Sequence, residues 1–189
     1  MVECKIAWHE RWTSLRSEGG DLAGVVSQKD LILQCRDRKN SGEKIVFLAG
    51  RFDFLHPGHI RLLEQARDYG EILAVGVWSD FGAAKRALPL EPGTADAPER
   101  AFTPAGERAE ILAALAAVDY ALEVAPEALP ELLVELRPEI VVEGASQAPP
   151  TPLARAAIAA GSALVRIPLE PGHSTAGIIE RIVHLSGSE

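Results

Sequence analysis

The sequence predicts a doubly wound α/β domain: a parallel sheet of about five strands with helices on both faces, a Rossmann-like fold. Short apolar runs rich in Val, Ile and Leu alternate along the chain with segments whose apolar residues recur at helical spacing. This alternation requires crossover connections, which make neighbouring strands parallel. A length of 189 residues, 47% hydrophobic and 24% charged, fits one such domain with a sizeable core.

Residues 1–26 show no clear periodicity and are predicted to be an N-terminal extension. This extension is expected to be a surface arm, and it carries Trp8 and Trp12. Residues 27–189 are predicted to be the folded domain. Its first helix begins at Ser27, a good N-cap with an acid three residues later, and ends at Ser41.

Five buried strands and five further helices are predicted after this first helix. The strands lie at residues 44–49, 72–78, 119–124, 140–142 and 163–167, and the helices at 60–66, 107–117, 128–136, 153–160 and 175–185. Residues 87–106 contain four prolines and two glycines and are predicted to be a long loop. A loop of this length inside a compact domain is usually a functional lid or a disordered segment.

Composition and charge exclude several classes of protein. With 27 acidic and 19 basic residues, the net charge of −8 argues against a duplex nucleic-acid binder, which normally presents a basic surface. Cys4 and Cys35 are too few for a disulfide framework or a structural zinc site. No apolar run approaches the ~20 residues of a membrane span, and the first residues lack a signal sequence, so we expect a cytoplasmic protein.

The strongest candidate site follows the first strand, where the chain reads Gly-Arg-Phe-Asp-Phe-Leu-His-Pro-Gly-His over residues 50–59. In doubly wound sheets, ligands bind at the carboxyl ends of the strands. Gly50 and Gly58 allow the backbone to approach a ligand closely, and Pro57 suits the first turn of a helix. The helix start offers unpaired N–H groups and a partial positive charge, which together bind anions.

His56 and His59 lie three residues apart, so both imidazoles can face the same space at this helix start. Two imidazoles there can donate hydrogen bonds to charge that develops on a phosphate. The alternatives are structural histidines or a zinc pair. Zinc needs further ligands, for which only Asp53 or His173 is available, and neither a P-loop nor a dinucleotide fingerprint is present. We therefore predict a phosphate site without protein metal ligands.

These residues resemble the G-x-F-D-x-x-H-x-G-H signature of the cytidylyltransferase-like nucleotidyltransferases. Over residues 27–184 the chain is similar, more narrowly, to the adenylyltransferase domain of the ADP-heptose synthesis enzymes. The further matching pieces are Val77-Trp-Ser-Asp80, Glu107-Arg-Ala-Glu-Ile-Leu-Ala-Ala-Leu115, Val118-Asp119-Tyr120, Gly172-His-Ser-Thr-Ala176 and Ile178-Ile-Glu-Arg-Ile182.

The resemblance implies nucleotidyl transfer, in which a phosphorylated acceptor attacks the α-phosphate of a nucleoside triphosphate and pyrophosphate leaves. It implies ATP as the donor, Mg²⁺ as the cofactor, a sugar phosphate such as heptose 1-phosphate or a polyol phosphate as the acceptor, and a homodimer. The alternatives are a CTP-dependent enzyme of the glycerol-phosphate type and a nucleotide-binding homologue with weak or no catalysis. No nucleic acid or membrane is expected as a partner.

By motif position, the resemblance assigns catalytic roles to His56 and His59, which would hold the triphosphate and stabilise the transition state. It also implies that Lys85 neutralises the triphosphate, and a solvated charge pair with Arg86 is the alternative. The other nucleotide-binding positions that it implies are Gly50, Arg51, Phe52, Asp53, Gly58, Arg108, Ser174 and Thr175.

Several of these positions have a structural alternative. Ser174 and Thr175 open the last helix, where Ser and Thr are good N-caps. Arg108 is either a nucleotide contact or a surface arginine paired with Glu107 or Glu110.

Three further positions near the predicted strand ends carry open interpretations. Asp53 is structural or orients a histidine, and Trp78 faces the base or packs in the core. Glu143 stands where the similar enzymes carry a lysine. A carboxylate facing a phosphate is repelled unless a cation bridges the two groups.

Overall fold

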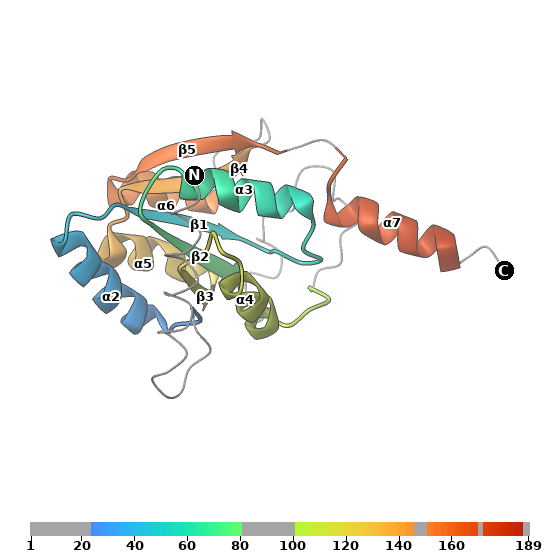
Figure 1. The fold of residues 1–189 in the computed structure, drawn as a ribbon, viewed down its shortest axis with the longest axis horizontal. Helices are drawn as coiled ribbons and strands as arrows, with labels where there is room; N and C mark the ends of the chain where they lie inside the picture. Colours follow the sequence, from blue (N-terminus) through green and yellow to red (C-terminus); the bar gives the residue numbers. More distant parts are fainter. Residues whose placement is uncertain (1–23, 81–100, 146–150, 170–171, 187–189) are drawn as a thin grey trace, which may run out of the picture.

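The computed structural model describes residues 24–80, 101–145, 151–169 and 172–186. Its centre is a five-stranded sheet in which every pair of neighbours is parallel, in the order β3-β2-β1-β4-β5 (Figure 1). The strands are β1 (Ile45–Gly50), β2 (Ile72–Trp78), β3 (Tyr120–Val124), β4 (Ile140–Ala145) and β5 (Ala163–Pro168). The predicted doubly wound α/β fold with about five strands is confirmed.

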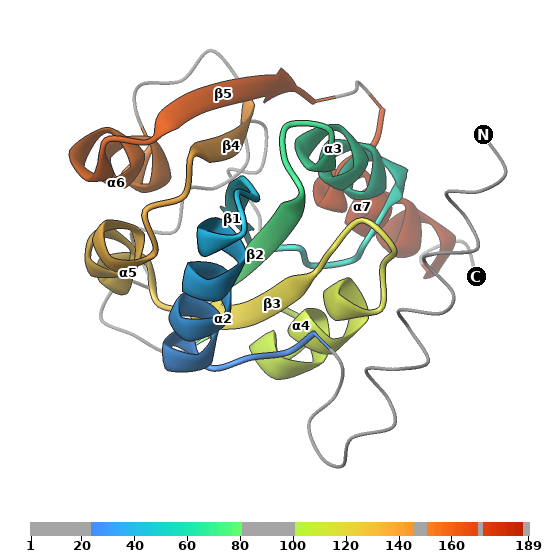
Figure 2. The same cartoon turned by 60° about the vertical axis from the view of Figure 1, so that its left-hand side comes forward.

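Helices cover both faces of this sheet. One face carries α2 (Gln28–Asn40), α5 (Leu129–Leu136), which follows the short 3-10 turn η2 (Pro126–Ala128), and α6 (Pro152–Ala160). The other face carries α3 (Pro57–Arg67) and α4 (Ala105–Ala113). Figure 2 shows these two groups on opposite sides of the sheet, and Figure 1 shows α7 (Thr175–Ser186) extending from the carboxyl edge of the strands.

Alternation along the strands divides the core into two layers. Phe47 and Val141 pack against α2, α5 and α6, whereas Val46, Leu48 and Val142 pack against α3 and α4. All five side chains are at most 1% exposed, and burial of such a side chain stabilises the fold by roughly 1.5–3 kcal/mol. Because both faces are covered, the central strands read as continuous apolar runs.

The observed boundaries differ from the predicted ones mainly at helix ends. Helix α3 begins at Pro57 instead of residue 60, since His56 caps it and proline suits its first turn. Helix α4 occupies Ala105–Ala113 instead of residues 107–117, because the chain leaves the helix at Ala114 and continues through tight turns. Residues 105 and 106 therefore belong to a helix, not to the predicted loop.

The first described residues lie beside the edge strand β3. The N–H of Val26 donates to the carbonyl of Ala121, and Val25 forms an isolated parallel bridge with the same residue. Ser27 then caps α2 by accepting the N–H of Asp30, as predicted. Residues 1–26 as an extension remain a prediction, and Trp8 and Trp12 lie outside the described residues.

The switch point of the topology lies between β1 and β4. The helix that follows β1, α3, covers one face of the sheet, and the helix that follows β4, α6, covers the other. Doubly wound proteins bind ligands at this point, outside the carboxyl ends of the strands. The segment after β1, residues 50–59, is where the phosphate site is predicted, and it is called the phosphate loop below. Among the described helices, none combines the length and apolar character that crossing a membrane requires.

Candidate nucleotide-binding and active site

The segment after β1 folds back tightly on itself. Phe52 and Phe54 both have positive φ angles, 52° and 46°, a conformation that costs a non-glycine residue of order 1 kcal/mol. The Phe52 ring is only 3% exposed, and its burial holds this conformation. A β-carbon on Gly50 would lie 3.1 Å from the Phe52 ring, so glycine is what lets the loop close over the strand end.

His56 and His59 are brought together at the start of α3. His56 is the N-cap, and its Nδ1 accepts the N–H of His59 at 3.4 Å. A neutral imidazole that accepts through Nδ1 carries its proton on Nε2, which is then a donor. The two rings stack with centroids 3.8 Å apart and an interplanar angle of 18°, and they are 8% and 4% exposed. The predicted pairing of these side chains in one space is confirmed.

Contacts on either side fix the position of this histidine pair. The ring of Phe52 lies 5.4 Å from that of His59, centroid to centroid. A β-carbon on Gly58 would lie 3.1 Å from Nδ1 and Cε1 of His56 and 3.2 Å from Cβ of His173. The residue at position 58 must therefore be small, and the segment that leads into α7 approaches from the far side.

The last helix begins beside the phosphate loop. The Thr175 hydroxyl donates to the carbonyl of Asp53 at 2.9 Å, and the Ser174 hydroxyl accepts the N–H of Gly177 at 3.1 Å. Ser174 is thus the N-cap that the sequence predicts, while Thr175 fastens α7 to the loop after β1. Two helix N-termini, those of α3 and α7, meet at this loop.

The distribution of acids favours an anion at these helix starts. Helices α4 and α5 carry an acid in the first turn, Glu107 and Glu131. The first turns of α3, α6 and α7 carry none. These three helices follow β1, β4 and β5. The strands β1 and β4 flank the switch point, and β5 is the edge strand beside β4. A helix N-terminus without its own acid is free to stabilise the negative charge of a ligand.

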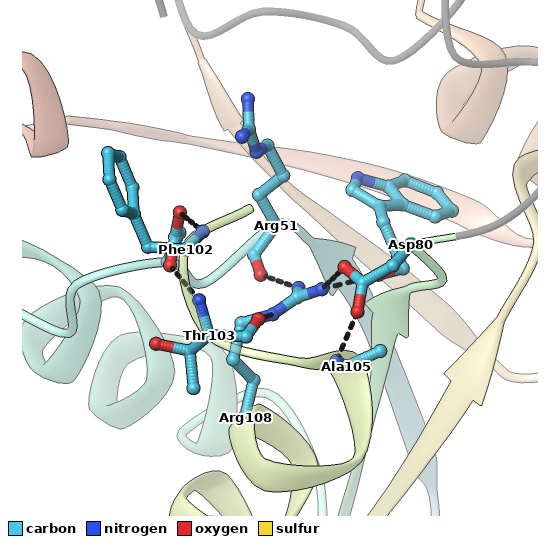
Figure 3. Close-up of polar contacts among 8 residues, drawn as sticks. Arg51, Asp80, Phe102, Thr103, Ala105 and Arg108 are labelled. Atoms are coloured by element: carbon cyan, nitrogen blue, oxygen red, sulfur yellow. Dashed lines mark hydrogen bonds and ion pairs between the residues drawn. The ribbon is translucent and has the colours of Figure 1, made fainter. Parts of the chain in front are cut away.

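Arg108 forms the centre of a polar network beside the loop that follows β1 (Figure 3). It is 2% exposed, and its guanidinium forms an ion pair with Asp80 at 2.6 Å. The same guanidinium donates to the carbonyls of Thr103 at 2.7 Å, Trp78 at 3.0 Å and Arg51. Arg108 therefore joins the loop after β1, the end of β2 and the segment that leads into α4.

Two aspartates complete this network. Asp80 accepts the N–H of Ala105, the first residue of α4, at 2.7 Å. Asp53 accepts the N–H groups of Phe102 and Thr103 at 2.8 and 3.3 Å. The segment before α4 is thus held by one carboxylate from the phosphate loop and one from the end of β2.

The structure resolves several alternatives that the sequence leaves open. Arg108 as a surface arginine paired with Glu107 or Glu110 is wrong, because the residue is buried and pairs with Asp80. Trp78 packs in the core on the side of α2, α5 and α6. Asp53 is structural in the sense that it binds backbone N–H groups.

Two further predictions concern the charged residues after β2 and on β4. Lys85 and Arg86 lie outside the described residues. Glu143 is 8% exposed, and its carboxylate accepts the Thr151 hydroxyl and forms an ion pair with Arg166 at 3.1 Å. A cationic side chain of the protein itself, Arg166, therefore lies beside this carboxylate.

The sequence does not predict the roles of four residues in these contacts: Asp80, Thr103, Thr151 and Arg166. Asp80 carries a usable signal, since it follows β2 at the carboxyl edge, where doubly wound folds place functional side chains. Thr103 takes part through its carbonyl and N–H, which no residue-type pattern reveals. Arg166 becomes visible only through the register of β4 and β5, in which it lies opposite Glu143.

A metal site built from protein side chains needs at least three suitable groups close together. In the described part of the chain, no three His, Cys, Asp or Glu residues are grouped in that way.

Fold and site together define a doubly wound α/β protein with a buried, stacked histidine pair at the start of the helix that follows its first strand. The sequence model of the cytidylyltransferase-like family matches residues 47–157, from β1 to α6. The chain belongs to this family.

Similar curated proteins carry the name bifunctional protein HldE. The protein from Hyphomonas neptunium is 34% identical over 160 residues, which is 84% of this chain and 31% of the relative. The protein from Syntrophotalea carbinolica is 37% identical over 146 residues, covering 77% of this chain and 28% of the relative. The chain thus spans about a third of the length of these relatives.

Solved structures share the fold at lower identity. A lipopolysaccharide core biosynthesis protein from Thermoplasma volcanium superposes with a TM-score of 0.55 at 23% identity, covering 68% of this chain and 99% of that one. Pantothenate synthetase from Thermus thermophilus gives a TM-score of 0.50 at 17% identity, covering 77% of this chain and 61% of that one.

Proposed function

We propose that the protein is a nucleotidyltransferase that transfers AMP from ATP to a sugar or polyol phosphate and releases pyrophosphate. The observation that carries this proposal is the buried, stacked pair of His56 and His59 at the N-terminus of α3, directly after β1. Membership of the cytidylyltransferase-like family supports the reaction class. The HldE relatives and the likeness to the ADP-heptose synthesis enzymes support ATP as donor and a heptose 1-phosphate-like acceptor.

In this reaction an oxygen of the acceptor phosphate attacks the α-phosphorus of the nucleotide. A new P–O bond forms, the bond from the α-phosphorus to the bridging oxygen breaks, and pyrophosphate takes the electron pair of that bond. Such a transfer needs positioning and charge stabilisation, and it needs no covalent intermediate with the protein. Nε2–H of His56 and the ring of His59 would donate to phosphate oxygens as charge develops on them.

The remaining site residues would shape and hold the triphosphate. Gly50 and Phe52 set the close approach of the loop, and Gly58 keeps space beside His56. Ser174 and Thr175 would offer hydroxyls and the N-terminus of α7 to the phosphates. Arg51 and Lys85 would add positive charge.

Arg108 and Asp53 would act by positioning the phosphate loop, since they bind backbone groups of the loops around the site. When Mg²⁺ is bound, it would neutralise the triphosphate and make pyrophosphate a better leaving group. Mg²⁺ in such sites is commonly held in large part by the phosphates of the substrate, so the nucleotide itself would supply ligands.

The test is a pyrophosphate-release assay with ATP, CTP, GTP and UTP against heptose 1-phosphate, mannose 1-phosphate and glycerol 3-phosphate. We expect release with ATP and a sugar phosphate, and a fall of roughly two or more orders of magnitude in His59→Ala. The matched control is His184→Ala, because His184 is exposed on α7. Thermal unfolding of each variant separates loss of chemistry from loss of fold.

Three outcomes would contradict parts of this proposal. Normal turnover by His59→Ala refutes the role of the histidine pair. Release only with CTP and glycerol 3-phosphate assigns the protein to the cytidylyltransferase alternative. Tight nucleotide binding without turnover on any acceptor assigns it to the non-catalytic alternative.

A further inference from the structure

The ion pair of Glu143 and Arg166 has no role in the proposed transfer of AMP. Glu143 lies on β4 and Arg166 lies directly opposite it on β5. The side chain of Glu143 is 9% exposed and that of Arg166 is 40% exposed. A half-exposed guanidinium is thus held against a buried carboxylate in the carboxyl-terminal halves of β4 and β5.

This pair lies beside the end of β1. The register pairs Leu48 with Val142, so Glu143 is level with Ala49, the residue before the phosphate loop. Successive residues of a strand point to opposite faces of the sheet. Val142 and Ile167, the sequence neighbours of Glu143 and Arg166, pack on the α3 side, so Glu143 and Arg166 lie on the face covered by α6. The histidine pair starts the helix on the opposite face. The two groups therefore lie at the same switch point, on its two sides.

Glu143 can accept, and Arg166 can donate, more hydrogen bonds than they form with the described residues. One oxygen of Glu143 accepts the Thr151 hydroxyl and the other accepts Nε of Arg166 at 3.1 Å. Each carboxylate oxygen has a second lone pair. Within the described residues, no protein acceptor is seen for the two Nη groups of Arg166, which carry four N–H donors.

The charge of the pair selects the kind of ligand. A carboxylate beside a guanidinium is neutral overall, so it gives little attraction for a phosphate dianion. It does present acceptors and donors side by side, and a hydroxyl group needs one of each. A polyhydroxylated carbon chain or ring matches such a surface better than a phosphate does.

We propose that Glu143 and Arg166 form a subsite for the hydroxyl groups of the acceptor substrate, on the α6 side of the switch point. This inference rests on the proposed function and deepens it: the histidine side binds the reacting phosphates, and the carboxylate–guanidinium pair selects a hydroxyl-rich body. Thr151 positions the carboxylate and also caps α6 through the N–H of Ala154.

The kinetic test compares Arg166→Gln and Glu143→Gln with the wild type, using the best acceptor of the pyrophosphate-release assay. We expect the KM for a sugar phosphate to rise roughly tenfold or more, since hydrogen bonds to charged groups are lost. The KM for ATP should stay within about twofold of the wild-type value. Arg166→Lys should give an intermediate KM. The control is Arg155→Gln, an exposed arginine on α6.

A binding test keeps this inference separate from the proposed reaction. Saturation-transfer NMR with mannose 1-phosphate and with glycerol 3-phosphate, without nucleotide, reports which protons contact the protein. We expect transfer to the sugar ring protons in the wild type and its loss in Arg166→Gln, even if no turnover occurs. An unchanged acceptor KM, a parallel rise in the KM for ATP, or no ring-proton transfer to the wild type overturns the subsite. Failure of pyrophosphate release alone overturns only the proposed reaction.

Discussion

At the scale of single residues, Arg108 illustrates what a guanidinium does that another cation does not. Its planar group donates in several fixed directions, and here those directions reach three backbone carbonyls and one carboxylate. A lysine ammonium donates from a single point. The identity of this side chain, beyond its charge, therefore fixes how the loops around the site are joined.

Replacing Arg108 by lysine should show this difference. Arg108→Lys keeps the charge opposite Asp80 but leaves buried carbonyls of Arg51, Trp78 or Thr103 without a donor. Each such group costs about 1–3 kcal/mol, so we expect the free energy of unfolding to fall by roughly 2–4 kcal/mol. Urea unfolding measures this change. Arg36→Lys, at an exposed position of α2, is the matched control, and an equal loss of stability in both variants would refute the explanation.

Cys35 gives a prediction for alkaline pH. Burial raises the pKa of this thiol from 9.0 to about 12. Between these values the unfolded chain releases the proton while the folded chain keeps it, so stability falls as pH rises above about 9, by at most roughly 1.4 kcal/mol per pH unit.

Cys35→Ala should lower stability at neutral pH, because a buried side chain is truncated, and should remove this part of the alkaline dependence. Urea unfolding at neutral pH and at two or more values above the ordinary thiol pKa measures both effects. Cys4→Ala serves as the control. A wild type and a Cys35→Ala variant with parallel pH dependence would show that the thiol does not contribute.

At the scale of elements, the start of α3 combines helix capping with the site. His56 caps the helix, Pro57 occupies its first position and Gly58 its second, and His59 closes the turn. The residues that begin this helix are therefore the same residues that form the predicted phosphate site. This is why the sequence predicts that the two imidazoles meet at this helix start.

Gly58→Ala should separate these two roles. Alanine favours the helix by up to about 1 kcal/mol, but its β-carbon would lie 3.1 Å from the His56 ring, which must shift by a few tenths of an ångström. Because transfer depends on alignment, we expect kcat to fall roughly tenfold while the melting temperature changes little.

Gly106→Ala is the matched control for this substitution. Gly106 also occupies the second position of a helix, α4, and a β-carbon there meets no atom within 4 Å. It should keep full activity. A Gly58→Ala variant with the turnover of Gly106→Ala would show that the histidine pair tolerates the displacement.

At the scale of the whole molecule, the alternation of apolar strands and amphipathic helices was sufficient to predict the fold. A buried parallel strand leaves a continuous apolar run, and each of the five runs became a strand within about three residues of its predicted ends. The strand order was not predictable in this way, since it depends on which strands pair across the sheet. The ion pair of Glu143 with Arg166 follows from that pairing.

The network around Arg108 was unpredictable for a second reason. Most of its acceptors are backbone carbonyls, which every residue possesses, so no sequence pattern marks them. Residue types show where a buried cation is possible, and only the positions of the loops show what it binds.

The homodimer expected from the resemblance also belongs to this scale and stays a prediction. Light scattering on the purified chain should give twice its mass of 20.2 kDa. Helix α7 presents Ile182, Val183 and Leu185 with 51%, 63% and 76% of their area exposed. A mass of one chain at micromolar concentration would contradict the prediction.

The hydrogen bond between Asp80 and the N–H of Ala105 has a consequence for the evolution of this chain. These two residues stand at the two ends of the stretch that separates β2 from α4, and the bond brings those ends to one point. Once the ends of a stretch are fixed together, the entropy of closing it grows only with the logarithm of its length, about 0.6 kcal/mol per doubling. The fold should therefore tolerate changes of length between Asp80 and Phe102, where Asp53 already holds the chain, and descendants of this chain can vary that stretch without rebuilding the sheet.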